Sequence, residues 1–382
     1  MAALAELGGD GPDGDAAPQP PCPDPTVSVS PSHGRRRKLV LHVDLNNTIL
    51  ISDAVTAQGT VAALENFLSS VTWGRMSREG PGTSWLSQSS REQLSRASVL
   101  LLQGDGELAV RGEDGRLYHW ILPSFFQLLR DLAQERREFA VVFRTFGSDL
   151  PRVLRALSRA LKEGAHPLFP DLSDLGFLKV NAAVGRIRCS RGGVVLTRDG
   201  ERVSTRDGER GLYRYLSALQ GLGGFQDHFE WWASNTFSIR GGKPLWVDPF
   251  DQSVQHIFID DNIRQDDEDT IVHPKVASSR VDEDTPPSGC LGNFSLRLSP
   301  SFLSGKHLIC LFSFGPSSSL CVFKVFLDPG GTETRTACTS ELYDLTLVQT
   351  DLLQALSDRS YFTRRVHICL ENYQRNVQPE DA

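Results

Sequence analysis

Three short runs of apolar residues, each ending abruptly in polar residues, predict strands that are buried in a sheet. They lie at residues 39–43, 138–143 and 254–259. Continuous apolar runs of this length are typical of strands covered on both faces, as in a mainly parallel sheet. After the second run, Ser148 and Asp149 suit a helix start, and apolar residues at helical spacing continue to about Glu163. This strand, its glycine turn and its helix form one βα unit.

Apolar residues three and four positions apart predict further helices that cover such a sheet. One helix is expected from about Pro123 and another at 212–219, and the carboxyl end at 343–376 carries a long apolar stripe. Alternation of strands and helices predicts an α/β protein. We therefore expect a doubly wound, mainly parallel sheet with cap-like insertions and a helical carboxyl end.

Short alternating runs between these strands predict β-hairpins. Asp-Gly pairs separate the runs at 99–103, 107–111 and 116–120, which are expected to form a small β-meander. Residues 185–190 and 194–197 flank an Arg-Gly-Gly turn and are expected to pair as a hairpin. Both groups fall within insertions expected at about 49–137 and 164–242.

The composition of the chain divides it into four parts. Residues 1–34 are rich in glycine and proline and are expected to be disordered, because they cannot bury enough apolar surface. Residues 35–280 carry the α/β core with its insertions. Residues 281–340 are expected to be irregular apart from one strand near 320–327, and an isoform-specific insertion is one hypothesis for them. Residues 341–376 are expected to form helices that pack on the core.

Charge and cysteine usage narrow the class of protein. The net charge of -7 argues against general affinity for nucleic acid, and no apolar run approaches the length of a membrane span. The amino end lacks a secretion signal, and the seven cysteines are scattered without metal-binding spacing, so we expect a cytoplasmic protein. The basic run at 35–38 is interpreted as the solvated flank of a strand, with nuclear import as the alternative.

An aromatic-rich segment follows the predicted helix at 212–219. Such clusters usually belong to a hydrophobic core, and the alternative is a surface that stacks on a base or sugar. Its members are Phe225, Phe229, Trp231, Trp232 and Phe237.

Polar residues follow each of the three predicted core strands. Asp44 ends the first, Thr145 closely follows the second, and Asp260 and Asp261 end the third. Carboxyl ends of neighbouring parallel strands meet at one edge of a sheet, where open α/β sheets bind their ligands. A carboxylate there can attack phosphorus, a carboxylate pair can hold Mg²⁺, and a lysine can neutralise phosphate oxygens. Taken singly, each residue is also compatible with an ordinary turn or helix cap.

The order Asp44-x-Asn46-x-Thr48, then Thr145, then Asp260-Asp261 resembles the haloacid dehalogenase-like (HAD) superfamily over roughly residues 39–263. The resemblance implies a hydrolase, a phosphatase in the first place, with Asp44 as the nucleophile. It also implies Mg²⁺ held by Asp44, the main-chain carbonyl of Asn46 and Asp260, with Asp261 helping to orient the site. A phosphorylated small molecule or a phosphoprotein would be the partner.

The resemblance also calls for a lysine as the third motif of the superfamily. Lys243 is the candidate, because it lies at a suitable distance before Asp260 in a Gly-Gly-Lys-Pro sequence that was interpreted as a turn. Lys179 and Lys275 are the alternatives.

Asn46 departs from the resemblance, because the superfamily pattern has an aspartate at this position as general acid. An amide cannot protonate a leaving group or activate water, and such help typically contributes about 10²–10⁴ in rate. Two hypotheses follow. The chain is either a phosphatase of weak or narrow activity, or a non-catalytic protein that binds a phosphorylated ligand or a protein partner in the same crevice. No other catalytic motif is present in the sequence.

Overall fold

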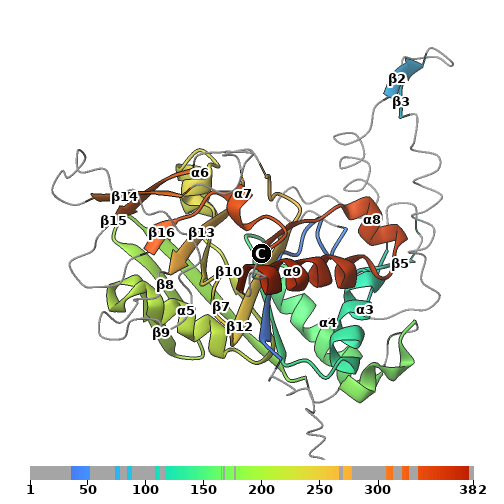
Figure 1. The fold of residues 1–382 in the computed structure, drawn as a ribbon. Helices are drawn as coiled ribbons and strands as arrows, with labels where there is room; N and C mark the ends of the chain where they lie inside the picture. The colour runs from blue at the N-terminus through green and yellow to red at the C-terminus, as the bar shows by residue number, and fades with distance from the viewer. Residues whose placement is uncertain are drawn as a thin grey trace, which may run out of the picture. The chain divides into compact units, whose positions relative to one another are not determined.

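The fold is known from a computed structural model, shown in Figure 1. The part of the chain that the structure describes comprises residues 36–51, 74–77, 84–87, 108–111, 115, 117–164, 166, 168–175, 178–265, 270–277, 307–312, 321–326 and 334–377. The expectations for residues 1–34, for the strand at 99–103 and for residues 281–306 lie outside these residues.

A large mixed sheet forms the centre of the described chain. Its eight strands lie in the order β17-β12-β1-β6-β10-β7-β8-β9. The first six are parallel to one another, and β8 and β9 extend the sheet as antiparallel strands. The expectation of an α/β fold with a mainly parallel sheet is therefore confirmed. The strands are β1 (Lys38–Val43), β6 (Phe139–Thr145), β7 (Val180–Ser190), β8 (Gly193–Arg198), β9 (Glu201–Ser204), β10 (Gly221–Gln226), β12 (Val254–Asp260) and β17 (Leu347–Gln349).

The strand order reverses direction at β1. From β1 the chain builds the sheet toward β6 and β10, and later it returns to add β12 and β17 on the other side of β1. A reversal of this kind opens a crevice between the carboxyl ends of the two strands that flank it, here β1 and β12. In the β1–β12 register Val43 lies opposite Ile259, so Asp44 and Asp260 follow side by side at that end.

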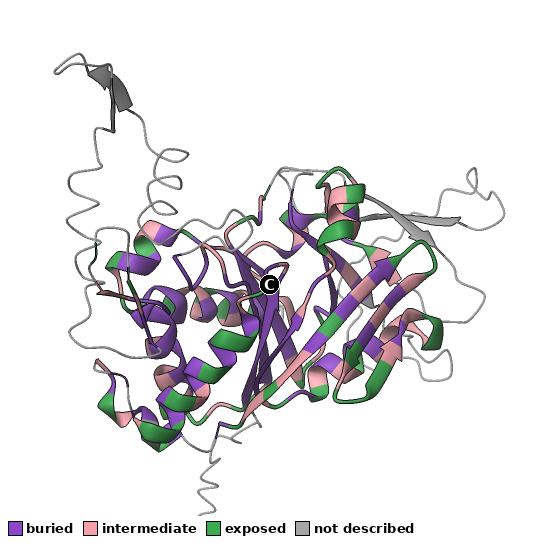
Figure 2. Cartoon of the chain, turned by 180° about the vertical axis from the view of Figure 1, so that it is seen from behind, coloured by how far each residue is buried: buried purple, intermediate pink, exposed green. Residues whose placement is uncertain are grey.

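Alternate residues of the central strands pack against helices on opposite faces of the sheet. On β1, Leu39 and Leu41 belong to one buried cluster and Val40 to another, as the two-residue repeat of a strand requires. The first cluster is covered by α3, α4, α8 and α9, and the second by α5. Figure 2 shows the central strands almost wholly buried and exposed residues on the outward sides of helices. The helices are α3 (Pro123–Gln134), α4 (Leu150–Glu163), α5 (Glu209–Ala218), α8 (Leu352–Ser357) and α9 (Tyr361–Val377).

Four smaller sheets are described in addition to the large one. A three-stranded sheet has the order β11-β13-β16, with β11 and β13 parallel. Three two-stranded antiparallel pairs, β2-β3, β4-β5 and β14-β15, are also described. The strands are β2 (Gly74–Ser77), β3 (Ser84–Ser87), β4 (Ala109–Arg111), β5 (Leu117–His119), β11 (Lys243–Val247), β13 (Val272–Ala277), β14 (His307–Phe312), β15 (Cys321–Phe326) and β16 (Thr334–Thr336). The remaining helices are α6 (Phe229–Ser234), α7 (Thr339–Leu342) and the 3-10 turns Pro170–Leu175, Thr205–Asp207 and Ile239–Gly241.

Most elements expected from the sequence are present. The three core strands, the helices after Pro123, Asp149 and Gly208, the β7–β8 hairpin and the strand near 320–327 are confirmed. Three expectations were wrong. The described part of residues 281–340 holds more than one strand, because β14 and β16 are present there in addition to β15. The Gly-Gly-Lys-Pro sequence is not simply a turn, because Lys243 begins β11, and the carboxyl end is not helical throughout, because Leu347–Gln349 pairs with β12 as β17.

Strand β10 was not anticipated, because its sequence Gly-Leu-Gly-Gly-Phe-Gln lacks the branched residues typical of strands. Its glycines have a packing reason. A Cβ atom on Gly224 would lie 2.7 Å from the Phe143 carbonyl oxygen and 2.9 Å from Leu150 Cδ1. Close packing of β6, β10 and the start of α4 therefore excludes a side chain there.

None of the described helices combines the length and the apolar composition that crossing a lipid bilayer requires.

Replacing Gly224 with alanine is expected to destabilise the protein by about 1–3 kcal/mol, because the new methyl group overlaps fixed backbone. Gly211→Ala is the matched control. Gly211 lies in α5 with no atom within 4 Å of the added Cβ, so this change is expected to stabilise by roughly 0.5–1 kcal/mol. Urea denaturation of both variants measures the difference. Equal effects of the two substitutions would contradict the packing described for β10.

Candidate functional site

The loop that follows β1 holds Asp44 at the carboxyl end of the sheet. The Leu45 carbonyl accepts hydrogen bonds from the backbone N–H groups of Thr48, Ile49 and Leu50, which closes a tight turn. Asn47 has a φ of 57°, a left-handed conformation that asparagine adopts more readily than most residues. The backbone N–H of Asp44 donates to the Ile259 carbonyl at 2.9 Å, so the side chain begins beside β12.

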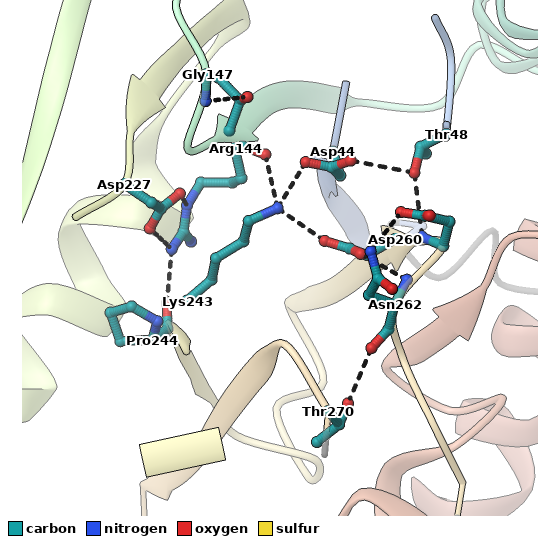
Figure 3. Close-up of polar contacts among 12 residues, drawn as sticks. Asp44, Thr48, Arg144, Gly147, Asp227, Lys243, Pro244, Asp260, Asn262 and Thr270 are labelled. Atoms are coloured by element: carbon teal, nitrogen blue, oxygen red, sulfur yellow. Dashed lines mark hydrogen bonds and ion pairs between the residues drawn. The ribbon is translucent and has the colours of Figure 1, made fainter. Parts of the chain in front are cut away.

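Lys243 joins the two acids that follow β1 and end β12. Its Nζ donates to Asp44 Oδ1 at 2.6 Å, to Asp260 Oδ2 at 2.8 Å and to the Arg144 carbonyl at 3.2 Å, as Figure 3 shows. These three acceptors use all three hydrogens of an ammonium group. Lys243 is only 1% exposed, a degree of burial that lysine reaches almost exclusively when it is paired.

Thr48 links the loop after β1 with the loop after β12. Its hydroxyl donates to Asp44 Oδ2 at 3.3 Å and accepts from the backbone N–H of Asp261 at 3.1 Å. On the other side, Asp260 Oδ1 accepts from the backbone N–H of Asn262 at 2.8 Å. Each of the two buried carboxylates therefore has one oxygen bound by Lys243 and the other held by a neighbouring loop.

A second buried ion pair fixes the strands around Lys243. Arg144, at the end of β6, donates to both carboxylate oxygens of Asp227 at 2.9 and 2.7 Å and also to the Pro244 carbonyl at 3.0 Å. Both side chains of the pair are 0% exposed. A two-pronged bond of this kind is among the strongest hydrogen-bonded pairs in proteins and has a fixed geometry. It ties β6, the end of β10 and β11 together and so holds the carbonyl that Lys243 uses.

The charges of the site do not balance. Lys243 faces two carboxylates directly, and Asp261 adds a third close by. Burial, together with the nearby Asp260, raises the pKa of Asp44 to about 7 even though Lys243 acts to lower it. Burial and the proximity of Asp260 and Asp44 raise the pKa of Asp261 well above its ordinary value. Burial alone would lower the pKa of Lys243, but Asp260 and Asp44 outweigh it and raise that pKa. Near neutral pH the site therefore holds a proton or attracts a further cation.

The three carboxylates could supply such a cation with ligands. One oxygen from each of Asp44, Asp260 and Asp261 lies within 4.8 Å of the other two. Hard divalent cations such as Mg²⁺ take carboxylate oxygens as ligands and keep several waters, so three acids at one edge fit them in number and in kind. Burial is the main cause of the raised pKa values of Asp44 and Asp261, and the neighbouring acids add to it; a bound cation would favour the charged carboxylates and offset both effects.

The structure brings four of the sequence-predicted site residues together and leaves two apart from the ion pairs. Asp44, Lys243, Asp260 and Asp261 form one cluster. Thr145 is buried, but its hydroxyl accepts from the Gly147 N–H at 3.0 Å and has no bond to the acids. Asn46 Oδ1 is buried and has no hydrogen-bond partner within the described residues.

Neither of the two alternative lysines is bonded to the acids of the cluster. Lys179 is exposed before β7, where its carbonyl accepts from Leu222, and the Lys275 ammonium is bonded to Glu209 at 2.8 Å. Of the three lysines considered, Lys243 is the one placed among the acids.

Sequence reasoning missed the roles of Arg144 and Asp227. A signal for Arg144 was available, since it is a charged residue next to a strongly apolar strand, where a buried partner is required. Asp227 carried no such signal, because the glycine-rich strand before it was not anticipated. Thr48 was part of the motif, but its bridging bonds depend on the loop geometry.

Comparison of the chain with family models, with curated proteins and with solved structures found no match.

Lys243→Met tests the buried triad. Removing the ammonium leaves two carboxylates buried without a partner, so the variant is expected to lose about 3–5 kcal/mol of unfolding free energy at pH 8. The loss should shrink toward pH 5, where protonation removes the uncompensated charges. Lys275→Met is the control, because its pair with Glu209 is partly exposed and contributes at most about 1 kcal/mol. Urea denaturation at both pH values gives the comparison, and a pH-independent loss would contradict the charge argument.

The raised pKa of Asp44 predicts a pH dependence with a definite sign. Between about pH 4 and pH 7 the folded protein keeps a proton on Asp44 that the unfolded chain, with a pKa of about 3.9, releases. The quantity to compare is the unfolding free energy of the wild type minus that of Asp44→Asn, measured without added divalent cations. This difference should fall as pH rises through the window. Taking this difference cancels the contribution of buried histidines, which act in the opposite direction. A flat or rising difference, measured by urea denaturation, would show that Asp44 is ionised when folded.

Proposed function

We propose that this protein is a Mg²⁺-dependent hydrolase of the HAD type, a phosphatase of weak or narrow activity that works through an aspartyl-phosphate on Asp44. The observation that carries the proposal is the joining of Asp44 and Asp260 by Lys243 at the point where the strand order reverses. In this position a carboxylate, a cation and a candidate metal cluster face one crevice, and phosphoryl transfer depends on positioning and charge stabilisation of this kind.

In the proposed reaction the Asp44 carboxylate attacks phosphorus while the bond from phosphorus to the leaving oxygen breaks. Lys243 holds Asp44 in place and faces the developing charge on the phosphoryl oxygens. Thr145 supports the same group, because its hydroxyl accepts from Gly147 and keeps its own hydrogen for a phosphoryl oxygen. Water then cleaves the aspartyl-phosphate, which releases phosphate and restores Asp44.

In this proposal Mg²⁺ is held by Asp44, the main-chain carbonyl of Asn46 and Asp260, with Asp261 alongside. When bound, the ion neutralises charge on the phosphate and orients it toward the nucleophile. The three carboxylates that lie within 4.8 Å of one another support this assignment.

We further propose that the segment between Leu50 and Ile121 is a cap on a HAD-like core. Leu50 pairs with Ile121 in an antiparallel bridge, and the Leu122 N–H donates to the Ile49 carbonyl at 2.9 Å. The chain thus leaves the core and returns to it at one point beside Asp44. A cap placed there would limit which phosphate esters reach the site.

A second function belongs to a different class: a non-catalytic protein that binds a phosphorylated ligand or a protein partner in the same crevice. Asn46 is the observation that favours it, because an amide at this position cannot supply general acid or base catalysis. Lys243 and the acids would then serve recognition of the phosphate and of its counter-ion.

Hydrolysis assays separate the two functions. With Mg²⁺, acetyl phosphate and a simple aryl phosphate are expected to be hydrolysed slowly, and Asp44→Asn should abolish the activity because the nucleophile is lost. Asn46→Asp restores a group that can protonate the leaving oxygen and should raise the rate, by up to about 10²–10⁴ for substrates with poor leaving groups.

Asn47→Asp is the matched control for the added charge, since it places the same carboxylate one residue further along the loop. It should not reproduce the gain. If neither the wild type nor Asn46→Asp turns over either substrate, yet Mg²⁺ raises the melting temperature, the non-catalytic function is favoured instead.

A further inference from the structure

A cluster of four aromatic rings, formed by Phe146, Phe229, Trp232 and Phe237, lies next to Lys243. The Lys243 Nζ atom is 5.3 Å from the centre of the Phe146 ring. Phe146 stacks on Trp232 with ring centres 4.9 Å apart and planes only 6° from parallel. Phe229 meets Phe146 edge-on at 6.0 Å, and Phe237 meets Trp232 edge-on at 5.0 Å. The four-ring cluster is therefore continuous from the buried ammonium to Phe237.

The two halves of the four-ring cluster differ in exposure. Phe146 and Trp232 are partly buried. They pack against a third buried apolar cluster, which includes Leu245, Phe258 and Val272. Phe229 and Phe237 are 36% and 48% exposed. Within the described residues only two other large apolar side chains are as open, Phe250 and Ile368. The inner rings thus belong to the core, and the outer rings form an aromatic surface beside the charged site.

The backbone at the outer edge of the cluster is strained. Thr236 and Phe237 both have a φ of 57°, in the left-handed region that is unfavourable for β-branched and bulky residues. Hydrogen bonds hold this conformation: the Thr236 N–H donates to the Ala233 carbonyl and the Phe237 N–H to the Trp232 carbonyl, both at 3.0 Å. Strain that keeps an exposed ring in one place is characteristic of ligand-binding positions.

We propose that the four-ring cluster binds the ring of an aryl phosphate monoester, the group carried by a phosphotyrosine side chain, while the phosphate lies at Lys243. The proposal rests on the proposed function, because it uses the same phosphate position. Only one oxygen separates phosphorus from the ring in such an ester, so a phosphate at Lys243 brings the ring next to Phe146. A nucleotide has a sugar between its phosphate and its base, which would carry the base past the inner rings.

The chemistry of the leaving group gives independent support. When Asp44 attacks an aryl phosphate, the bond from phosphorus to the phenolic oxygen breaks, and the phenolate leaves with the electron pair and takes its proton from water. A phenol has a pKa of about 10, so the phenolate departs without a strong general acid. An aliphatic alkoxide is far more basic and depends on the proton donor that Asn46 cannot replace. Water then hydrolyses the aspartyl-phosphate to phosphate and free Asp44.

Binding of two non-hydrolysable probes tests the proposal apart from turnover. Phenylphosphonate and methylphosphonate share the charged group and differ in the ring, and their affinities can be measured by calorimetry on the full-length protein with Mg²⁺ present. We expect phenylphosphonate to bind roughly 3- to 10-fold more tightly, the range expected for one aromatic pair. Phe146→Leu should reduce that preference more than it changes methylphosphonate binding, because Phe146 is the ring nearest Lys243. Phe237→Ala, at the outer end of the cluster, should reduce the preference less.

Phe250→Ala is the matched control, because Phe250 is 63% exposed and precedes β12, at the end of the sheet opposite Asp44. It should keep the full preference. Equal affinity for the two phosphonates, no binding of either, or tighter binding of adenosine 5′-phosphate than of phenylphosphonate would overturn the proposal.

Turnover separates this proposal from the proposed function. If acetyl phosphate is hydrolysed but phenylphosphonate has no advantage, the aryl specificity fails and the phosphatase stands. If phenylphosphonate binds as expected but nothing is hydrolysed, the catalytic function fails and the aryl phosphate site stands. Rates for free phosphotyrosine and for a tyrosine-phosphorylated peptide then show which source of the group the site accepts.

Discussion

The ammonium group of Lys243, held between the carboxylates of Asp44 and Asp260, is the interaction on which the arrangement of the site depends. It joins the loop after β1, the start of β11 and the end of β12, so it connects the eight-stranded sheet to the three-stranded sheet. A single buried cation between two buried acids leaves an excess of negative charge, and burial together with the nearby Asp260 raises the pKa of Asp44 although Lys243 acts to lower it. The same excess makes the cluster attractive to a divalent cation and keeps a carboxylate close to a cationic centre.

The order of the strands explains why these residues meet. Because β12 returns to the side of β1 away from β6, the carboxyl ends of β1 and β12 are neighbours, and their register places Asp44 beside Asp260. The buried Arg144–Asp227 pair then holds β6 and β10 against β11. A pair of this kind contributes little net stability compared with an apolar pair, but its fixed geometry determines where the Lys243 acceptors lie. Fold and charge thus specify one position for the lysine.

Much of this arrangement could be predicted from the sequence, and the remainder has identifiable physical reasons. The three apolar strands and their terminal acids follow from local hydrophobic patterns, and they led to Asp44, Asp260 and Asp261. Strand β10 could not be recognised, because its Gly224 is required by contacts with Phe143 and Leu150 that only the folded chain reveals. Strand β17 is only three residues long, too short to stand out within a helical segment. The partners of Lys243 and Arg144 are long-range contacts, which no local pattern specifies.

The central position of β1 has a consequence for how the protein folds. All six residues of the strand are buried, and its two neighbours in the sheet are encoded about 100 and more than 200 residues downstream. During synthesis both edges of β1 therefore stay open until β6 and then β12 have emerged. Contacts of such long sequence range slow folding and leave aggregation-prone edges unpaired in the meantime. The acid cluster needs Asp44 after β1 and Asp260 at the end of β12, so it can form only after β12 has been synthesised.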